Sequence, residues 1–149
     1  MFIGRYYNKL EAKGRVCLPK QIRQNCSDWV ITRGFDGALF LFPAQAFQTE
    51  LAKLSQLEFT KADHRNLIRL MTNEAQELAT DKTGRILIPE HLKKVGELDS
   101  EIVIVGSLNR VEIWDRDRYH QFFDKISQNT ESIAETIDWG STTEVAAKN

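Results

Sequence analysis

One arginine-bearing motif occurs twice in this sequence, and its residue types could bind a polyanion. The copies run over residues 11–19 and 81–89, and each reads acid, two linker residues, Gly-Arg, three apolar residues and proline. Arg15 and Arg85 are the two arginines. A guanidinium is a planar fork that can bond O6 and N7 of guanine in the major groove. The motif therefore predicts contacts between these arginines and nucleic acid.

Further basic residues lie close to the motifs and are candidates for phosphate contacts. They are Lys9, Lys13, Lys20, Arg23 and Lys82. Phosphate contacts position a protein on a duplex and do not read its sequence. The chain has a formal net charge of −1, yet residues 1–30 hold six basic and two acidic side chains. This basic end can attract a polyanion locally, although the whole protein is not basic.

The acid and the glycine of each motif have a structural interpretation. They are Glu11, Gly14, Asp81 and Gly84. A glycine supplies the positive φ of a tight turn, and we expect each acid to pair with the arginine of its own motif. The structural and binding interpretations are compatible, because an acid can orient an arginine whose other edge reaches DNA. Whether one or both turns contact DNA stays open at this point.

The sequence contains no recognisable catalytic pattern. The histidines, His64, His91 and His120, do not lie at ligand spacing from one another or from Cys, Asp or Glu. No Ser or Cys lies in a nucleophile elbow, and no glycine-rich loop has phosphate-binding spacing. We therefore expect no catalytic residues, no metal, no cofactor and no small-molecule substrate, and the chain is not predicted to be an enzyme.

The length and composition favour one shared core. The chain has 149 residues, of which 42% are hydrophobic and 28% are charged, as is usual for globular proteins. A unit of about 50 residues buries too little apolar surface to be stable alone, so two copies gain by packing together. The longest apolar runs are too short to cross a membrane, and the N-terminus lacks the apolar core of a signal peptide. We expect a cytoplasmic protein.

The elements that must position the motifs follow the same repeat. In the first copy, the apolar pattern predicts short strands at residues 5–10, 16–18, 29–33 and 39–42. In the second copy, it predicts strands at residues 77–80, 86–88, 101–105 and 110–114. Pro19 and Pro89 each open a short helix. Asp36-Gly37 and Asn109 are expected to supply the left-handed φ of the two hairpin turns.

Longer helices are expected between and after the two copies. Spacer helices begin at Pro43 and at Asp63, which is a suitable N-cap, and Asp115 caps a final helix. An apolar stripe on this final helix either packs on the protein's own core or lines a subunit interface; it contains Tyr119, Phe122, Phe123 and Ile126. The expected organisation is a first repeat with its following helix at 1–54, a helical spacer at 55–76, a second repeat with the C-terminal helix at 77–126, and a flexible tail at 127–149.

The motif resembles that of the AbrB-type swapped-hairpin barrel. The resemblance lies in Gly14-Arg15, three apolar residues, Pro19, and Arg23 four residues later. Two copies joined by a helical spacer resemble the MraZ family, as do the opening residues 1–4, the hairpin at 32–37 and the segment 103–115. The resemblance implies an α+β fold, in which two AbrB-like β repeats form a fused pseudo-two-fold swapped-hairpin barrel with short helices and two spacer helices.

The resemblance also implies a function. It implies a sequence-specific DNA-binding transcriptional regulator of the division and cell-wall gene cluster, including its own gene. It further implies a nucleoid-associated, ring-shaped homo-oligomer, octamer-like or dodecamer-like, on G-rich direct repeats of double-stranded DNA. The family motif carries onto Glu11, Gly14 and Arg15 and onto Asp81, Gly84 and Arg85, with Glu11 where aspartate is usual. The alternative is an AbrB-like antitoxin-type module that binds a protein partner.

Overall fold

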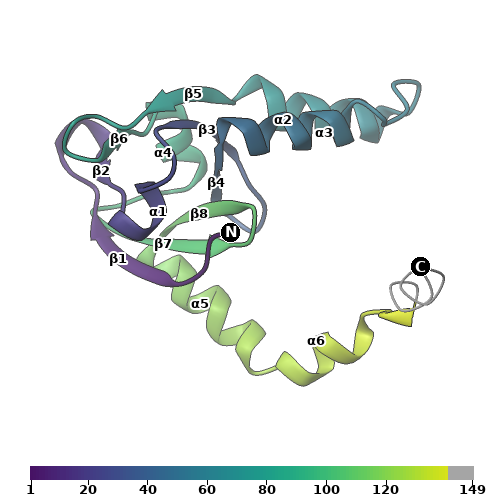
Figure 1. The fold of residues 1–149 in the computed structure, drawn as a ribbon. Coiled ribbons are helices and arrows are strands. Elements are labelled where there is room, and N and C mark those ends of the chain that lie inside the picture. The colour runs from purple at the N-terminus through teal and green to yellow at the C-terminus, as the bar shows by residue number, and fades with distance from the viewer. Residues whose placement is uncertain (141–149) are drawn as a thin grey trace. The chain divides into compact units, whose positions relative to one another are not determined.

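The computed structural model describes residues 1–140, and the strands of the two copies follow the repeat. The first copy contributes β1 (Arg5–Lys9), β2 (Arg15–Cys17), β3 (Asp28–Arg33) and β4 (Leu39–Pro43). The second copy contributes β5 (Gln76–Ala79), β6 (Arg85–Leu87), β7 (Glu101–Ser107) and β8 (Arg110–Asp115). Each strand expected from the apolar pattern is present, with bounds that differ by one or two residues (Figure 1).

The helices lie where the repeat and its spacer predict them. A 3-10 turn, η1 (Ala12–Gly14), precedes β2, and the short helices are α1 (Lys20–Arg23) and α4 (Glu90–Val95). The longer helices are α2 (Ala44–Leu54), α3 (Ala62–Asn73), α5 (Arg116–Ser127) and α6 (Thr130–Thr136). Residues Met1–Arg118 form one compact unit, and a second unit begins at Tyr119.

The two sheets are built by exchange between the copies. The six-stranded sheet has the order β1-β7-β8-β4-β3-β5, and the second sheet pairs β2 with β6. When each strand is replaced by its equivalent in the other copy, the order becomes β5-β3-β4-β8-β7-β1, which is the same order read from the other edge of the sheet. The two copies are therefore related by a pseudo-two-fold axis. The first strand of each copy pairs with the third strand of the other, since β1 pairs with β7 and β5 with β3. This interleaving confirms the expected α+β swapped-hairpin fold.

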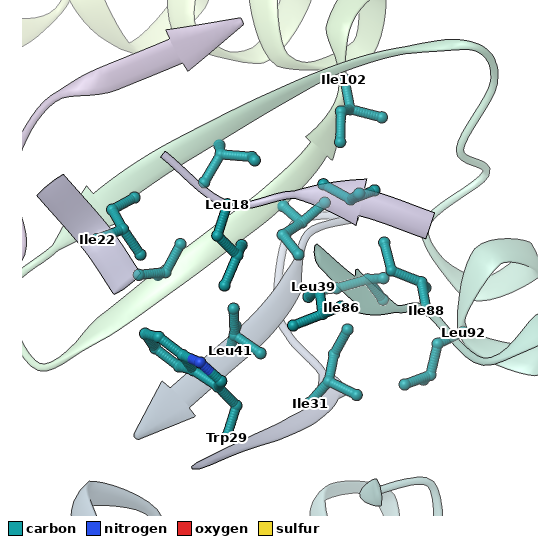
Figure 2. Packing of buried hydrophobic residues seen from close by; sticks show 14 residues of the cluster. Leu18, Ile22, Trp29, Ile31, Leu39, Leu41, Ile86, Ile88, Leu92 and Ile102 are labelled. Atoms are coloured by element: carbon teal, nitrogen blue, oxygen red, sulfur yellow. The ribbon is translucent and has the colours of Figure 1, made fainter. Parts of the chain in front are cut away.

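Both copies contribute to one hydrophobic core (Figure 2). Five pairs of repeat-equivalent positions belong to it: Val16 and Ile86, Leu18 and Ile88, Ile22 and Leu92, Leu39 and Val111, and Leu41 and Ile113. All ten side chains are at most 3% exposed. Neither copy encloses these residues by itself, so burial of apolar surface stabilises the copies only together.

The second hairpin turn differs from the expectation. Asp36 and Gly37 adopt φ of 62° and 92°, as the first hairpin requires, but in the second hairpin Leu108 takes φ of 66° in place of Asn109. The cause is tertiary: Phe2 and Leu108 exchange two backbone hydrogen bonds of 2.7 and 3.0 Å, which fix Leu108. The expectation that Asn109 adopts the left-handed conformation is therefore wrong.

The start of the second spacer helix needs correction. This helix begins at Ala62 with Lys61 at the N-cap, so Asp63 lies within the first turn, where its carboxylate faces the positive end of the helix dipole. The segment predicted as a flexible tail, 127–149, includes α6, and its residues 141–149 lie outside the described part; its flexibility stays a prediction.

The final helix begins as expected. Asp115 Oδ2 accepts a hydrogen bond from the backbone N–H of Arg118, as an N-cap does, and α5 starts at Arg116. Within the apolar stripe of α5, Tyr119 is buried and its ring stacks on Phe123 with a centroid distance of 5.4 Å. Phe122 is half-buried and Ile126 is 36% exposed.

Candidate nucleic-acid interface

The strands β2 and β6 form a two-stranded antiparallel ribbon that brings the two motifs side by side. Val16 lies opposite Ile86 in this ribbon, and both are buried in the core. Successive side chains of a strand alternate between its faces, so the neighbours of these two residues share the opposite face. This face, named the ribbon face below, consists of Arg15, Cys17, Arg85 and Leu87. Both predicted arginines therefore point away from the core.

Each motif turn is closed by a glycine and packs on the other copy. Gly14 and Gly84 adopt φ of 84° and 80°. The carbonyl of Gly14 accepts a hydrogen bond from Ile88 N at 2.9 Å, and the carbonyl of Gly84 accepts one from Leu18 N at 2.9 Å. A Cβ on Gly14 would lie 2.9 Å from the Ile88 carbonyl oxygen. Backbone conformation and space both require glycine here.

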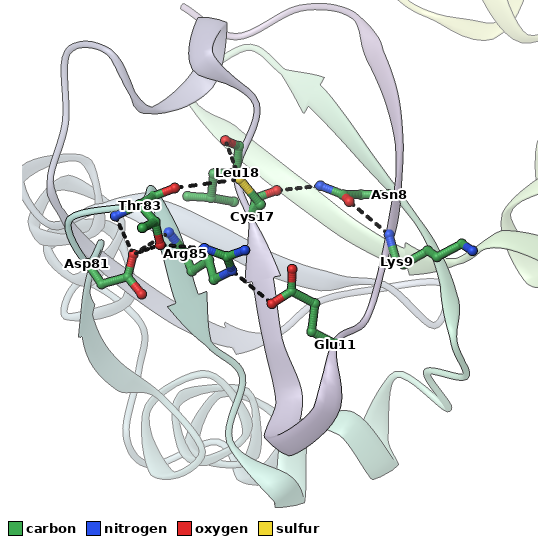
Figure 3. A network of polar contacts seen from close by, with 8 residues as sticks. All are labelled: Asn8, Lys9, Glu11, Cys17, Leu18, Asp81, Thr83 and Arg85. Carbon is green, nitrogen blue, oxygen red and sulfur yellow. Dashed lines mark hydrogen bonds and ion pairs between the residues drawn. The ribbon is translucent and has the colours of Figure 1, made fainter.

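The turn of the second copy is held by its own acid. Asp81 Oδ1 accepts hydrogen bonds from Thr83 N at 2.9 Å, the Thr83 hydroxyl at 2.8 Å and Arg85 N at 2.9 Å (Figure 3). These bonds favour the charged carboxylate, so the Arg85 N–H and the Thr83 hydroxyl hold the pKa of Asp81 below its ordinary value. The structure thus gives Asp81 a local turn-structuring contact.

Glu11 acts across the copies and not within its own turn. Its side chain makes no capping hydrogen bond to η1. Instead, Glu11 Oε2 accepts a hydrogen bond from Arg85 Nε at 2.8 Å (Figure 3). This bond raises the pKa of the Arg85 guanidinium. The ion pair joins an acid of one motif to the arginine of the other, whereas pairing within each motif was expected.

Arg15 is in a different situation from Arg85. Its side chain is exposed, and within residues 1–140 no hydrogen bond or ion pair engages its guanidinium. Lys9, Lys13 and Lys20 are also exposed. The first copy thus presents one unengaged guanidinium and three exposed ammonium groups.

Arg23 and Lys93 cover the two glycines. Arg23 is half-buried, donates Nε to the Leu18 carbonyl at 3.0 Å, and lies so close to Gly84 that a Cβ there would be 2.5 Å from Nε. Lys93 lies over Gly14 in the same way, and its Nζ pairs with Glu90 at 2.9 Å. Lys93 was not among the expected site residues, although it follows Arg23 by the offset of 70 that relates the two motifs. Lys82 is exposed on the second turn.

The structure also places the residues that were considered for other chemistry. Residues 1–140 contain no group of three or more His, Cys, Asp and Glu side chains placed to hold a metal ion. His64 Nδ1 accepts a hydrogen bond from Glu58 N at 2.9 Å, and burial raises the pKa of the Cys26 thiol, which leaves less of the reactive thiolate at neutral pH. No described helix has both the length and the apolar content that a bilayer span requires.

Both halves of the chain match one family model, described as "MraZ protein, putative antitoxin-like", over residues 1–70 and 71–138. The chain belongs to the MraZ family. It is 40% identical over 142 residues to the transcriptional regulator MraZ of Pediococcus pentosaceus, covering 94% of this chain and 99% of the relative. It is 38% and 39% identical to proteins of the same name from Heliobacterium modesticaldum and Moorella thermoacetica, covering 92% of this chain and 96% of each relative.

The turn contacts of Asp81 predict a pH-dependent stability in this MraZ-family chain. Asp81→Ala should lower the melting temperature by a few degrees at neutral pH, because it removes the acceptor of two backbone N–H groups. Since the folded-state pKa of Asp81 lies below its unfolded value, the stabilisation is complete above the unfolded pKa and is lost as pH falls through the folded one. Thermal melts of both proteins between neutral pH and about pH 2 should therefore converge at the acidic end. Equal melting temperatures at neutral pH would contradict the assignment.

Proposed function

We propose that this MraZ-family chain is a sequence-specific DNA-binding transcriptional regulator. The observation that carries the proposal is the ribbon face, where Arg15 is exposed and, within residues 1–140, unengaged. A two-stranded ribbon fits the major groove, where a guanidinium bonds guanine O6 and N7. The relatives named transcriptional regulator MraZ support the same function. The proposal assigns this chain no catalytic step and no cofactor.

In this proposal the basic residues divide into two roles. Arg15 reads guanine, and the exposed ammonium groups of Lys9, Lys13 and Lys20 neutralise phosphates on either side. Arg23, which is half-buried over Gly84, donates its remaining guanidinium N–H groups to a phosphate in this proposal. Lys82 and Arg85 belong to the second turn of the same surface.

The proposal extends to a ring-shaped, octamer-like or dodecamer-like homo-oligomer on G-rich direct repeats. With a net charge of −1, a single chain attracts DNA only through its local basic surface. A ring that places several Arg15 turns on successive repeats gains affinity from avidity. Exposed apolar side chains offer surface for subunit contacts in the unit Met1–Arg118; they include Met1, Ile3, Phe35 and Leu108.

The proposed target is the promoter of the division and cell-wall gene cluster, including the chain's own gene. In this proposal, occupancy of repeats near a promoter blocks RNA polymerase there, and the protein is cytoplasmic and nucleoid-associated. This target rests on the family membership.

Fluorescence titration and footprinting of the DNA upstream of its own gene test the proposal. We expect tight binding to a duplex with intact repeats, weak binding to a shuffled duplex, and more than one subunit per duplex. The logarithm of the affinity should fall with the logarithm of the salt concentration with a slope of roughly −0.9 per phosphate contact, or about −4 for four contacts. Equal affinity for intact and shuffled duplexes would overturn sequence-specific recognition.

The matching family model is described as antitoxin-like, which supports a second candidate function. In that case the chain would act as an interaction module that binds a small protein encoded next to it. Purification of the tagged chain from its native host separates the two functions. A stoichiometric small protein that stays bound at high salt would favour the antitoxin-type module over the DNA-binding regulator.

A further inference from the structure

We propose that Glu11 is a specificity residue that withholds Arg85 from DNA, so that the two Gly-Arg turns have unequal roles. This inference rests on the proposed DNA-binding function and concerns the same ribbon face. In it, Arg15 reads bases, whereas Arg85 is held in an ion pair with Glu11. The consequence is weaker binding to duplexes of arbitrary sequence.

The Arg85 guanidinium is already engaged by neighbouring side chains. Its Nε donates to Glu11 Oε2 at 2.8 Å, and its Nη1 donates to the Thr83 hydroxyl. Thr83 is held in turn by Asp81. A chain of charge-assisted bonds therefore runs from Asp81 through Thr83 and Arg85 to Glu11 (Figure 3). Two of the three nitrogens of the Arg85 guanidinium are engaged before any DNA arrives.

The first turn differs from the second in the groups that could engage its arginine. At the offset of 70, Lys13 stands where the second motif has Thr83, and an ammonium cannot accept a hydrogen bond from arginine. The backbones differ as well, because Lys13 has φ of 67° whereas Thr83 is not among the residues with positive φ. Glu11 is directed to the other copy, and within residues 1–140 no acidic side chain pairs with Arg15.

The charge of Glu11 also disfavours DNA contacts at Arg85. The Glu11 side chain is 42% exposed beside the ribbon face and carries a negative charge. A phosphate near Arg85 would be repelled by this carboxylate. A guanine edge would have to displace the carboxylate from Arg85 Nε. Both effects disfavour contacts through Arg85, and the repulsion acts on every sequence alike. Base contacts by Arg15 are spared, so the ratio of operator affinity to random-sequence affinity rises.

The experiment compares operator and random-sequence duplexes with wild-type protein, Glu11→Gln, Arg85→Ala and the double variant. We expect Arg85→Ala alone to change operator affinity less than about threefold, since Arg85 is already withheld. Glu11→Gln should raise random-sequence affinity about fivefold near 0.1 M salt and steepen the salt slope by about one, which is the effect of one added phosphate contact. Arg85→Ala should abolish this gain in the double variant, because the released group is Arg85.

Glu58→Gln is the matched control. It removes the same single charge and breaks an exposed ion pair, with Lys61, that lies between α2 and α3. It should leave the random-sequence affinity unchanged. A gain equal to that of Glu11→Gln would show an effect of net charge alone and would overturn the proposal. The proposal would also be overturned if Arg85→Ala lost as much operator affinity as Arg15→Ala.

A DNA-free measurement separates this inference from the proposed function. Brief labelling with phenylglyoxal, followed by mass spectrometry, reports how accessible each guanidinium is. In the wild-type protein Arg15 should react faster than Arg85, and Glu11→Gln should accelerate labelling at Arg85 only. Equal labelling of both arginines in the wild-type protein would overturn the ion-pair lock. Failure of the wild-type protein to bind any duplex, with the labelling difference intact, would overturn the DNA-binding function and leave the lock established.

Discussion

Arg15→Ala is expected to lower operator affinity about 10- to 100-fold, because one bidentate arginine–guanine contact provides about 1–3 kcal/mol of discrimination. Avidity in a ring multiplies the loss, since every subunit on the DNA loses the same contact. Folding should be unaffected: the Arg15 side chain is exposed, and no hydrogen bond or ion pair within residues 1–140 depends on it. Fluorescence anisotropy gives the affinity, and circular dichroism melting gives the stability of the same samples.

Two further variants make this result specific. Arg15→Lys keeps the charge but loses the planar fork, so the salt slope should persist while discrimination between intact and shuffled repeats falls. Arg69→Ala removes one exposed guanidinium from α3, and it should bind the operator like the wild-type protein. Unchanged operator affinity in Arg15→Ala would refute the assignment of the ribbon face as the DNA-binding surface.

Leu18→Ala is expected to reduce the free energy of unfolding by about 3 kcal/mol, which lies within the usual range for a fully buried leucine. Leu18 is 0% exposed and lies in the core to which both copies contribute (Figure 2). The remaining cavity would be lined by residues from both copies, so neither half can relax alone. Urea denaturation followed by tryptophan fluorescence and by far-ultraviolet circular dichroism, at one protein concentration, measures the change.

Leu87→Ala is the matched control for the core. Leu87 is also on the β2–β6 ribbon but points outward and is 52% exposed, so its truncation should change the free energy of unfolding by less than about 0.5 kcal/mol. Both probes should report a single transition for the unit Met1–Arg118, because the core is shared. Separate transitions for the two copies, or equal losses in both leucine variants, would contradict the shared core.

Much of the fold could be predicted because its signals are local. The repeated motif identifies equivalent positions, and the apolar pattern identifies the strands. The need for positive φ at Gly14 and Gly84 follows from the turn that each motif must make. A core shared by the two copies could be expected as well, since a single copy is too small to bury its own apolar residues. The interleaving of the sheet was implied only by the resemblance to the AbrB-type swapped-hairpin barrel.

The partners of the site residues could not be predicted in the same way. The ion pair of Glu11 with Arg85 joins positions 74 residues apart, and it depends on the register of β2 against β6. Leu108 takes the left-handed conformation that Asn109 would adopt more readily, because Phe2 bonds to its backbone. Neither contact can be inferred from the spacing of residues along the chain.

The sequence by itself thus determined the repeated turns, their family and the two arginines that could bind DNA. Only the tertiary structure decided that one guanidinium is unengaged within the described residues while the other is paired. The physical reason is range: backbone preference and hydrophobic period act over a few residues, whereas an ion pair is set by which side chains the folded barrel brings within about 3 Å of each other.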